Sequence, residues 1–377
     1  MFPPPPKDSI DWDNLGFDVT EVDGHVECHY SKETGEWSEP VFVTDPFLRI
    51  HGLTPALNYA QQAFEGLKAY RTRSGAIQVF RPRMNARRMA RSAAYVSVPA
   101  VPEAVFLRGV LLAVARNAAY VPPHGGGAAL YVRPIVFGSS ATLAMASPDR
   151  YTFCVYATPV GMAYGTASVA ALVLEDYDRV APRGTGRAKI GGNYAPLARH
   201  IREAATAVHA AGEEAGGYGI LLHLDSRARA EIDEFSMAGF VGVRARPEGG
   251  EEGGDGDGGG GGGYVLVVPE PTRTIESVTA DSVCAIARDL GWATESRAVR
   301  YEELASFCEV FAVGTAGALV PVRSITRKST GDVFSYGGGF QERGPCCSKL
   351  LTILRDIQQG NVEDRFGWCT TVTEMCD

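Results

Sequence analysis

The order of strand-like and helix-like segments is the feature that most constrains the fold of this chain. Residues 76–82, 128–138 and 151–160 (AIQVFRP, AALYVRPIVFG and YTFCVYATPV) have the β-branched and aromatic content that is typical of strands. Apolar residues at helical spacing predict helices over residues 84–96 and 102–121, the second with a proline in its first turn. Helices that accompany mostly antiparallel strands indicate an α+β unit.

A second group of elements follows residues 158–167, whose glycine and proline content is typical of a linker. The helix predicted over residues 194–212 carries Leu197, Ile201 and Val208 on one face and ends at Gly212. The other elements expected here are strands at 168–175, 219–225, 231–236, 240–245, 264–269, 309–315 and 320–325 and helices at 277–291 and 349–360.

We therefore predict an α+β fold of two domains. A smaller N-terminal domain would span residues 1–157, and a larger C-terminal domain of strands packed with helices would span residues 168–377, joined by the linker at 158–167. The pattern predicts no element after residue 360.

Residues 247–263 form a tract of glycine, proline and acidic residues without any large apolar side chain. Such a tract cannot bury enough surface to offset the entropy of ordering it, so we expect a disordered loop that joins two strands of a hairpin. A linker between domains is the competing interpretation. The strands expected on either side, 240–245 and 264–269, favour the hairpin because they look like neighbours in one sheet.

Charge and composition exclude several classes of protein. The net charge of -8 and a pI near 5.5 argue against a nucleic-acid-binding protein and favour a small-molecule partner. No apolar run is long enough to span a membrane, and residues 1–18 lack the features of a signal or transit peptide, so we expect a cytoplasmic protein. The 8 cysteines show no metal-binding spacing, and we expect free thiols.

Common catalytic motifs are missing from the sequence. It contains no P-loop and no G-x-G-x-x-G that follows a strand, which disfavours nucleotide binding through such loops. The 7 histidines are dispersed, and none stands beside an obvious serine or cysteine nucleophile. Hydrolase chemistry is therefore disfavoured as well.

Lys189 is the first candidate for a catalytic residue. The 36 basic residues comprise 6 lysines and 30 arginines, so surface charge in this chain is carried mainly by arginine. Lys189 lies among small residues in GTGRAKIGG, with Arg183 and Arg187 close by in the chain. Their charge would lower the pKa of Lys189 if the site were buried, and a partly neutral lysine can form a Schiff base with a carbonyl. Taken alone, a surface lysine is the commoner explanation.

Glu234 is the second candidate, because EIDEFSMAGF is apolar enough to be a buried strand and a buried carboxylate needs a partner. One interpretation is a structural ion pair with an arginine. The other is a carboxylate that holds a heterocyclic nitrogen protonated, as the pyridine of pyridoxal phosphate requires.

Two segments could bind an anion such as a phosphate. Ser277, Val278 and Thr279 begin a predicted helix, whose free N–H groups and dipole favour negative charge. Thr315 and Ala316 form a tight turn between two predicted strands, which could equally be an ordinary hairpin.

Taken together, these motifs resemble the branched-chain amino-acid aminotransferases, which are pyridoxal-phosphate enzymes of fold type IV, and in particular a divergent eukaryotic or fungal member. The resemblance extends from about Asp45 to Trp368. It departs from the family at Gly239, where asparagine is usual, and at Asn58. The matching segments, in chain order, are LNYAQQAFEGLKAYR, FRPRMNARRM, YVRPIVFG, GTGRAKIGGNYAPL, EIDEFSMAGF, ESVTADSV and VGTAGALVPVRSI.

The resemblance implies a role for each matched residue. Lys189 is similar to the lysine that binds pyridoxal phosphate as a Schiff base and then moves a proton at the substrate Cα. Glu234 is similar to the partner of the pyridine nitrogen, and Tyr194 to the hydroxyl beside the phenolic oxygen. The positions that resemble the phosphate site are Arg88, Val278, Thr279 and Thr315. The positions that resemble the substrate site are Tyr59, Phe64, Tyr131, Arg133, Tyr164, Thr315 and Ala316.

The resemblance also suggests why glycines follow Lys189. They would let the backbone approach the cofactor, and Asn193 and Tyr194 would begin the helix that carries the tyrosine to it. No metal is implied.

The leading functional hypothesis is a homodimeric transaminase that takes nitrogen from a branched-chain or other hydrophobic L-amino acid and gives it to 2-oxoglutarate by a ping-pong mechanism. A lyase of the same fold, or a transaminase of specialised metabolism with a different substrate, is the alternative. Arg133 favours a transaminase, since only that reaction needs to bind a second carboxylate. A non-catalytic protein is disfavoured because Lys189, Glu234, Tyr194 and Arg88 are all present.

Replacing residues 248–263 with a short turn should leave turnover and the melting temperature nearly unchanged. A tract that buries nothing stabilises little, and the entropy of loop closure varies slowly with length. Thermal melting and turnover of the shortened protein test this. A large fall in either would mean that the tract is ordered or takes part in function.

Overall fold

The computed structural model describes residues 2–162, 167–207, 217–246, 263–270, 272–336 and 343–375. The chain forms two compact units. The first comprises Met1–Gly165, Ala188–Ala195 and Arg355–Asp377, and the second comprises Thr166–Arg187 and Pro196–Leu354. The sequence places residues 188–195 and 355–377 in the larger C-terminal domain, whereas in the structure both segments pack with the first unit.

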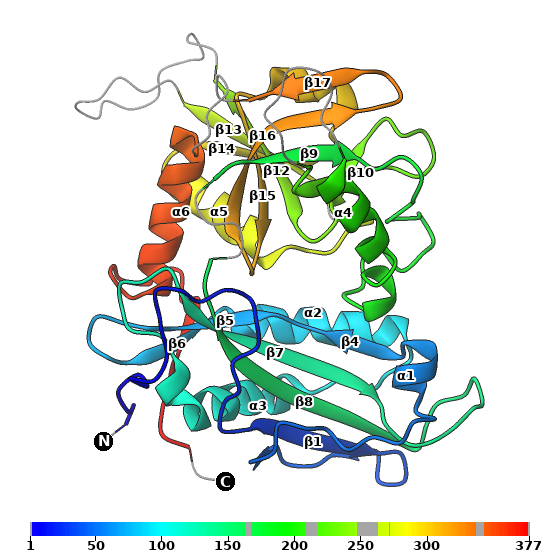
Figure 1. The fold of residues 1–377 in the computed structure, drawn as a ribbon, viewed down its shortest axis with the longest axis vertical. Coiled ribbons are helices and arrows are strands. Elements are labelled where there is room, and N and C mark those ends of the chain that lie inside the picture. Colours follow the sequence, from blue (N-terminus) through cyan, green and yellow to red (C-terminus); the bar gives the residue numbers. More distant parts are fainter. Residues whose placement is uncertain are drawn as a thin grey trace. The chain divides into compact units, whose positions relative to one another are not determined.

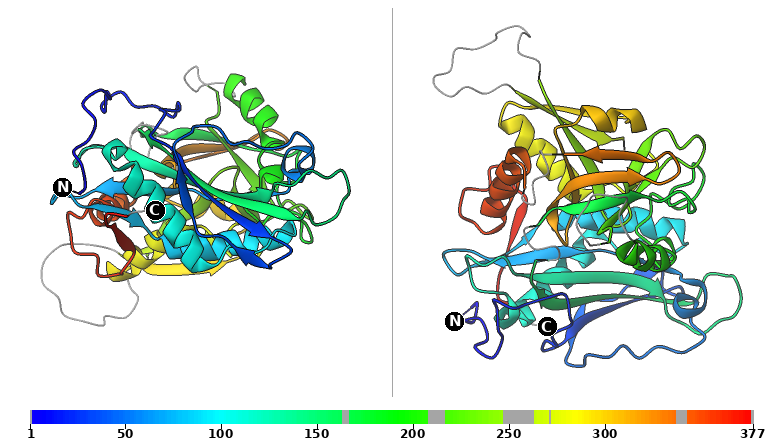
Figure 2. Two further views of the ribbon diagram at one scale, coloured as in Figure 1. Left: turned by 90° about the horizontal axis from the view of Figure 1, so that it is seen from below. Right: turned by 45° about the horizontal axis from the view of Figure 1, so that its top comes forward.

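The first unit is built on an antiparallel sheet of nine strands. Their order is β18-β6-β5-β7-β8-β1-β2, with β3 paired to β1 and β4 paired to β7. Figure 2 shows the two longest strands, β7 and β8, side by side. The strands are β1 His25–Ser31, β2 Glu36–Trp37, β3 Val41–Val43, β4 Gln62–Phe64, β5 Leu67–Arg71, β6 Ile77–Phe80, β7 Ala129–Gly138, β8 Arg150–Val160 and β18 Cys369–Val372. The helices are α1 Pro55–Tyr59, α2 Pro82–Tyr95, α3 Glu103–Arg116 and the 3-10 turns η1 Ala118–Tyr120 and η2 Gly191–Asn193.

Alternation along the strands gives this sheet two different faces. In the register of β5 with β7, Leu67 lies opposite Val132 and Lys68 lies opposite Tyr131. Leu67 and Val132 belong to the hydrophobic core, whereas Tyr131 is half-buried and the next residue on its face, Arg133, is exposed. The sheet therefore presents one apolar face to the core and one polar face that carries several candidate site residues.

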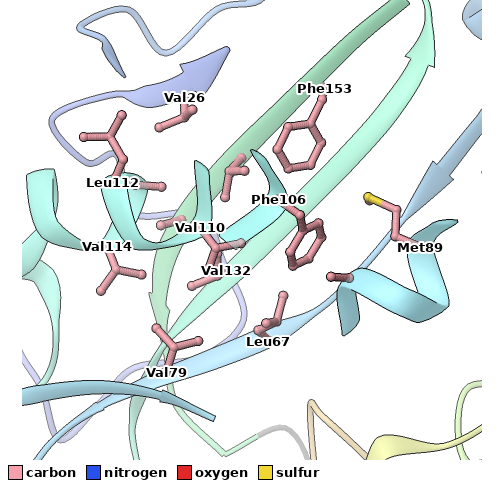
Figure 3. Packing of buried hydrophobic residues seen from close by; sticks show 14 of the residues in the cluster. Val26, Leu67, Val79, Met89, Phe106, Val110, Leu112, Val114, Val132 and Phe153 are labelled. Atoms are coloured by element: carbon pink, nitrogen blue, oxygen red, sulfur yellow. The ribbon is translucent and has the colours of Figure 1, made fainter. Parts of the chain in front are cut away.

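Helices α2 and α3 cover the apolar face. Figure 1 shows α3 along β8 and β1, and Figure 3 shows Phe106 of α3 pointing toward Phe153 of β8, with Met89 of α2 nearby. The rings of Phe106 and Phe153 have their centroids 5.7 Å apart, and both side chains are fully buried. Gly109 allows this contact, because a Cβ there would lie 2.9 Å from the Phe153 ring. The sheet and the two helices thus form the core of the first unit.

The second unit is a mixed sheet, also of nine strands, in the order β11-β10-β9-β16-β15-β12-β13-β14, with β17 paired to β16. β9 pairs in parallel with β10 and β16, and β13 pairs in parallel with β14. The strands are β9 Val169–Val173, β10 Ile220–Leu224, β11 Ile232–Phe235, β12 Gly239–Ala245, β13 Tyr264–Pro269, β14 Ala293–Arg297, β15 Glu309–Gly314, β16 Ala318–Arg327 and β17 Asp332–Ser335. The helices are α4 Leu197–Thr206, α5 Val278–Asp289 and the 3-10 helix η3 Tyr301–Ser306, while α6 Pro345–Gln358 begins in this unit and ends in the first.

The prediction that residues 240–245 and 264–269 are neighbouring strands is confirmed, since β12 and β13 pair antiparallel. Most of the glycine-rich tract between them, residues 247–262, lies outside the described residues. Each of the other predicted strands corresponds to a strand of the structure, with ends shifted by a few residues.

The predicted helices differ from the structure at their ends, and two of these differences have a clear local cause. The helix expected from Tyr194 begins at Leu197, because Pro196, which has no N–H to donate, occupies its N-cap. Val208 and Gly212, the predicted end of that helix, lie outside the described residues. The helix expected to reach residue 121 ends at Arg116, where the side-chain amide of Asn117 donates to the backbone carbonyls of Ala113 and Gly24.

The cysteines and the membrane prediction can be checked in the described residues. Cys28, Cys154, Cys284, Cys308, Cys346, Cys347 and Cys369 are all free thiols there, as predicted. Cys376 lies outside the described residues. No helix in the described part of the chain is long and apolar enough to cross a membrane.

Replacing Phe106 with alanine should lower the free energy of unfolding by about 3–5 kcal/mol, because it leaves a cavity between α3 and β8. Phe47→Ala is the matched control, since Phe47 is 73% exposed and its truncation should cost no more than about 0.5 kcal/mol. Urea denaturation followed by circular dichroism measures both. Similar losses for the two variants would contradict the assigned core.

Candidate functional site

The backbone of Lys189 is attached to two elements of the first unit. Its N–H donates to the Ser92 hydroxyl of α2 (2.9 Å), and its carbonyl accepts from the N–H of Phe64 in β4 (3.0 Å). Ile190 forms a β-bridge with Ala63, the residue before Phe64 in β4. These contacts explain why residues 188–195 pack with the first unit although the surrounding chain belongs to the second.

The amine of Lys189 lies beside a hydroxyl and two aromatic rings. Its Nζ donates to the Tyr194 hydroxyl at 3.0 Å and lies 4.6 Å from the centre of the Phe64 ring and 4.9 Å from that of Tyr194. The turn η2 brings Tyr194 back toward the lysine, rather than the helix that the sequence predicts. Gly191 allows the turn to pack against β4, because a Cβ at Gly191 would overlap the side-chain amide of Gln62.

A buried ion pair lies next to this lysine. The Glu65 carboxylate accepts from Nε and from the terminal nitrogen of Arg88, both at 2.7 Å, and from the Asn85 side chain at 2.7 Å. Burial alone would raise the pKa of Glu65, but the charge and hydrogen bonds of Arg88, with the charge of Lys189, hold that pKa below its usual value. Burial alone would lower the pKa of Arg88, and the same carboxylate raises it. Both groups therefore stay ionised.

Sequence motifs do not single out Glu65, although it lies within the matched segment QAFEGL. It is fully buried, and only the structure shows that its charge is compensated by Arg88. A glutamate between apolar residues is the signal that could have indicated it.

Tyr131 and Arg133 of β7 lie on one side of the sheet, since they are two residues apart on the strand. The Arg133 guanidinium donates to the Tyr131 hydroxyl at 3.2 Å and lies 5.1 Å from the centre of the Phe64 ring. Gly66 makes room for this arrangement, because a Cβ there would overlap the Tyr131 hydroxyl. Within the described part of the chain, no carboxylate lies within ion-pair distance of Arg133.

Phe17 is a further aromatic neighbour that the sequence does not reveal. Its ring packs edge-on against Tyr131, with centroids 6.4 Å apart. The N-terminal segment is held there because the Gly16 carbonyl accepts from the N–H of Gly161 (3.0 Å) and the Thr20 N–H donates to the Thr158 hydroxyl (3.1 Å). Nothing in the local pattern around Phe17 predicts a contact with a strand more than a hundred residues away.

Two other predicted substrate residues have no described contact with this cluster. Tyr59, at the end of α1, is 42% exposed, and its hydroxyl donates to the Leu143 carbonyl at 2.8 Å. Tyr164 lies outside the described residues. Asn58, one of the departures from the family pattern, donates to the carbonyls of Gly52 and Thr54 and so stabilises the start of α1.

The second unit contains a separate cluster around Glu234. Its carboxylate on β11 lies 3.2 Å from the terminal nitrogen of Arg179, and the two side chains are 7% and 1% exposed. The ion pair expected as one of two interpretations of Glu234 is therefore present. It does not exclude the other interpretation, since a carboxylate has lone pairs for more than one donor.

The start of α5 lies close to the ends of β12 and β15. The Ser277 hydroxyl caps the helix by accepting from the N–H of Ala280 (3.1 Å), and Val278 and Thr279 form its buried first turn. A Cβ at Gly239 would lie 3.2 Å from a Val313 methyl and 3.4 Å from the Ser277 Cβ. Gly239 thus allows close packing here, which the usual asparagine of the family would disturb.

Thr315 and Ala316 lie half-buried in the turn between β15 and β16. The preceding residue, Gly314, lies near the turn that follows β11, with a Cβ position 3.7 Å from that of Ala238. Five predicted residues, namely Glu234, Val278, Thr279, Thr315 and Ala316, therefore belong to neighbouring elements of the second unit.

These two clusters provide complementary chemistry. The first offers an amine that can bind a carbonyl, a hydroxyl beside it, an arginine held by a carboxylate and a second, exposed arginine. The second offers a buried carboxylate for a ring nitrogen and a helix N-terminus for an anion. By chemical type, an amine, a carboxylate and a helix N-terminus suit the aldehyde, the ring nitrogen and the phosphate of a phosphorylated pyridine aldehyde.

Comparisons with known proteins agree with this chemistry. The model of the amino-transferase class IV family matches residues 62–325. The chain is 49% identical over 374 residues to aminotransferase poxL of Penicillium oxalicum, covering 99% of this chain and 96% of that protein. It is 48% identical to transaminase htyB of Aspergillus rugulosus, covering 98% and 95%. It is also 46% identical to the branched-chain amino acid aminotransferase gloG of Glarea lozoyensis, covering 99% of each.

A solved structure shows the same fold. The crystal structure of the branched-chain amino acid aminotransferase of Escherichia coli superposes with a TM-score of 0.70 at 22% sequence identity, covering 94% of this chain and 100% of that one. The two-domain α+β fold type predicted from the sequence is therefore confirmed.

Glu65→Gln should lower the free energy of unfolding by about 3–5 kcal/mol, because it leaves the Arg88 charge buried without its partner. Glu65→Met combined with Arg88→Met should cost less, since no buried charge remains. The stabilisation by Glu65 should be present above about pH 4.5 and lost as the pH falls through its lowered pKa. Urea denaturation across pH measures these effects.

Glu39→Gln is the matched control, because the pair of Glu39 with Arg108 is exposed (3.2 Å) and should contribute almost nothing. Equal losses for Glu65→Gln and Glu39→Gln would show that the buried pair does not stabilise the first unit.

Proposed function

This chain belongs to the class IV aminotransferase family, whose cofactor is pyridoxal 5'-phosphate, and we propose that it transfers the amino group of a hydrophobic L-amino acid to 2-oxoglutarate. Transamination is common to the relatives whose names state an activity. The proposal adds the amino donor and the acceptor, with a branched-chain amino acid as the leading donor.

The contact between the Lys189 amine and the Tyr194 hydroxyl carries the proposal. The bound cofactor supplies an electron sink for the charge that develops when a substrate Cα–H bond breaks. Lys189 would bind the cofactor and hold the proton that leaves and returns at Cα, and Tyr194 would orient the amine through their 3.0 Å hydrogen bond. The rings of Phe64 and Tyr194 would exclude water from this amine.

The remaining predicted residues would hold the two ends of the cofactor. Glu234 would accept from the protonated ring nitrogen. Arg88, Val278, Thr279 and Thr315 would bind the phosphate, with Arg88 oriented by its hydrogen bonds to Glu65. The start of α5 suits this role, because a helix N-terminus presents N–H groups and a positive dipole end to an anion.

Substrate binding would involve the polar face of the first sheet. The Tyr131 hydroxyl and the backbone of Thr315 and Ala316 would bind the α-carboxylate. Phe64, with Tyr59 and Tyr164 as further positions of the pocket, would contact the aliphatic side chain. Arg133 would bind the second carboxylate of the acceptor, and its exposure and lack of a carboxylate partner among the described residues support this role.

A transaminase with another donor, including one of specialised metabolism, is the second candidate. Two of the three relatives described above have names that state an activity without a substrate, and only one is named for branched-chain amino acids. The Gly239 packing, which differs from the family pattern, also favours it. Assay of the purified enzyme with 2-oxoglutarate and each L-amino acid in turn distinguishes the two.

A homodimer is the proposed assembly. Leu53, Leu57, Tyr59, Leu143 and Met145 are apolar side chains that are 42–84% exposed, and Tyr59 is linked to Leu143 by a hydrogen bond. Such a group of exposed apolar side chains is typical of a protein interface. Light scattering should give twice the mass of one chain, and the mass of a single chain would contradict the proposal.

Lys189→Ala should abolish transamination without unfolding the protein, because it removes the amine that would bind the cofactor. Borohydride treatment of the wild-type holoenzyme should leave a phosphopyridoxyl group on Lys189, detected by peptide mass spectrometry. Lys349→Ala, at an exposed position of α6, is the matched control and should retain both the label and the activity. A fully active Lys189→Ala enzyme would contradict the assignment.

Arg133→Ala should slow the half-reaction with glutamate about tenfold to a hundredfold, since hydrogen bonds to a charged group contribute about 1.5–3 kcal/mol. The half-reaction with leucine, which has no second carboxylate, should change much less. Single-turnover rates with the two donors measure the difference. Equal losses would mean that Arg133 supports the fold or the cofactor rather than the acceptor.

A further inference from the structure

Polar residues of the second unit lie beside Glu234, and the proposed function assigns them no role. Arg179 lies in the segment after β9, with its terminal nitrogen 3.2 Å from the Glu234 carboxylate. His223 of β10 is the register partner of Glu234 on β11, so the two side chains lie on the same face of this strand pair. The His223 Nε2 lies 2.8 Å from the Ser236 hydroxyl.

Because Glu234 and Arg179 are both buried, the charge state of the Glu234 carboxyl group matters. Glu234 is 5% exposed and Arg179 is 5% exposed as whole residues. A carboxylate so deeply buried takes up a proton unless a positive charge or several donors compensate it. A neutral carboxylic acid could only donate a hydrogen bond to a pyridine nitrogen, whereas an ionised carboxylate can leave the proton on that nitrogen.

His223 adds no second positive charge to this cluster. Burial, with the charges of Arg179 and His200, lowers the pKa of His223 to about 3, so the imidazole is neutral at physiological pH. Arg179 thus provides a positive charge beside Glu234.

We propose that Arg179 is a positioning residue for Glu234: its guanidinium keeps the buried carboxylate ionised and in one orientation, so that the carboxylate holds a proton on the ring nitrogen of pyridoxal phosphate. This inference rests on the proposed role of Glu234. A second guanidinium contact supports it, because the other terminal nitrogen of Arg179 donates to the carbonyl of Gly186 at 3.5 Å.

Binding of two cofactors to the apoprotein tests the inference. One is pyridoxal phosphate, and the other is its analogue with carbon in place of the ring nitrogen. Arg179→Met should raise the Kd of pyridoxal phosphate roughly tenfold or more, because it weakens or removes the charge-assisted hydrogen bond between the Glu234 carboxylate and the ring nitrogen. The Kd of the analogue should stay within about twofold or improve. Arg179→Lys, which keeps the charge, should show a smaller loss for pyridoxal phosphate.

The Glu234→Gln background shows whether Arg179 acts through Glu234. In that background Arg179→Met should cause no further loss of affinity, since the carboxylate that it positions is gone. The double variant also contains no uncompensated buried charge, so together with Arg179→Lys it decides the question if Arg179→Met alone does not fold.

Arg273→Met is the matched control. Arg273 pairs with Asp233, the neighbour of Glu234 that points to the opposite face of β11, at 3.3 Å. This variant removes an arginine that pairs with the residue next to Glu234 and leaves the pair of Glu234 with Arg179 in place, so its affinity for pyridoxal phosphate should stay within about twofold of wild type.

Equal losses for the two cofactors, or a loss that persists in the Glu234→Gln background, would overturn the positioning role and leave the proposed function intact. Wild-type apoprotein that does not bind pyridoxal phosphate would overturn the proposed function and the inference with it.

Discussion

The attachment of the Lys189 backbone to β4 and α2 is the constraint on which the candidate site depends. One hydrogen bond to the Ser92 hydroxyl and one from the Phe64 N–H hold a short segment against the first unit, while the chain on both sides belongs to the second. Because the backbone is fixed at Lys189, the η2 turn can return Tyr194 to the amine within five residues. The aromatic ring of Phe64 lies on the same strand that anchors the lysine, so the position and the surroundings of the amine are determined together.

Each unit then uses the same device, a buried carboxylate paired with a buried arginine. In the first unit Glu65 fixes Arg88 through two hydrogen bonds of 2.7 Å, and in the second Arg179 lies 3.2 Å from Glu234. A pair of this kind contributes less to stability than its Coulomb energy suggests, because both charges lose their hydration. In the first unit such a pair keeps both groups ionised and in one orientation, and we propose the same for the pair in the second unit.

Much of the fold and part of the site could be predicted from the sequence, for identifiable reasons. Local patterns predict the strands at 129–138 and 150–160 and the helix after Ser277, because apolar spacing and capping residues act within a few residues. β18 has no such local pattern, and it exists because it pairs with β6 far away in the chain. Arg179 is one of 30 arginines, and Phe17 lies in an N-terminal segment without periodic structure, so only long-range contacts reveal that they touch Glu234 and Tyr131.

The sequence by itself determined the identities of the reactive groups and the family to which they point: a lysine among small residues, a carboxylate on an apolar strand and a helix start suited to an anion. These are properties of residue type and short spacing, which survive without a fold. Tertiary structure decided which unit holds Lys189, that a 3-10 turn and not a helix presents Tyr194, and that an arginine pairs with each buried carboxylate. Those outcomes depend on hydrogen bonds and ion pairs between segments that are distant in the chain. No local pattern shows which polar groups become buried together, and burial sets the energy of leaving them unpaired.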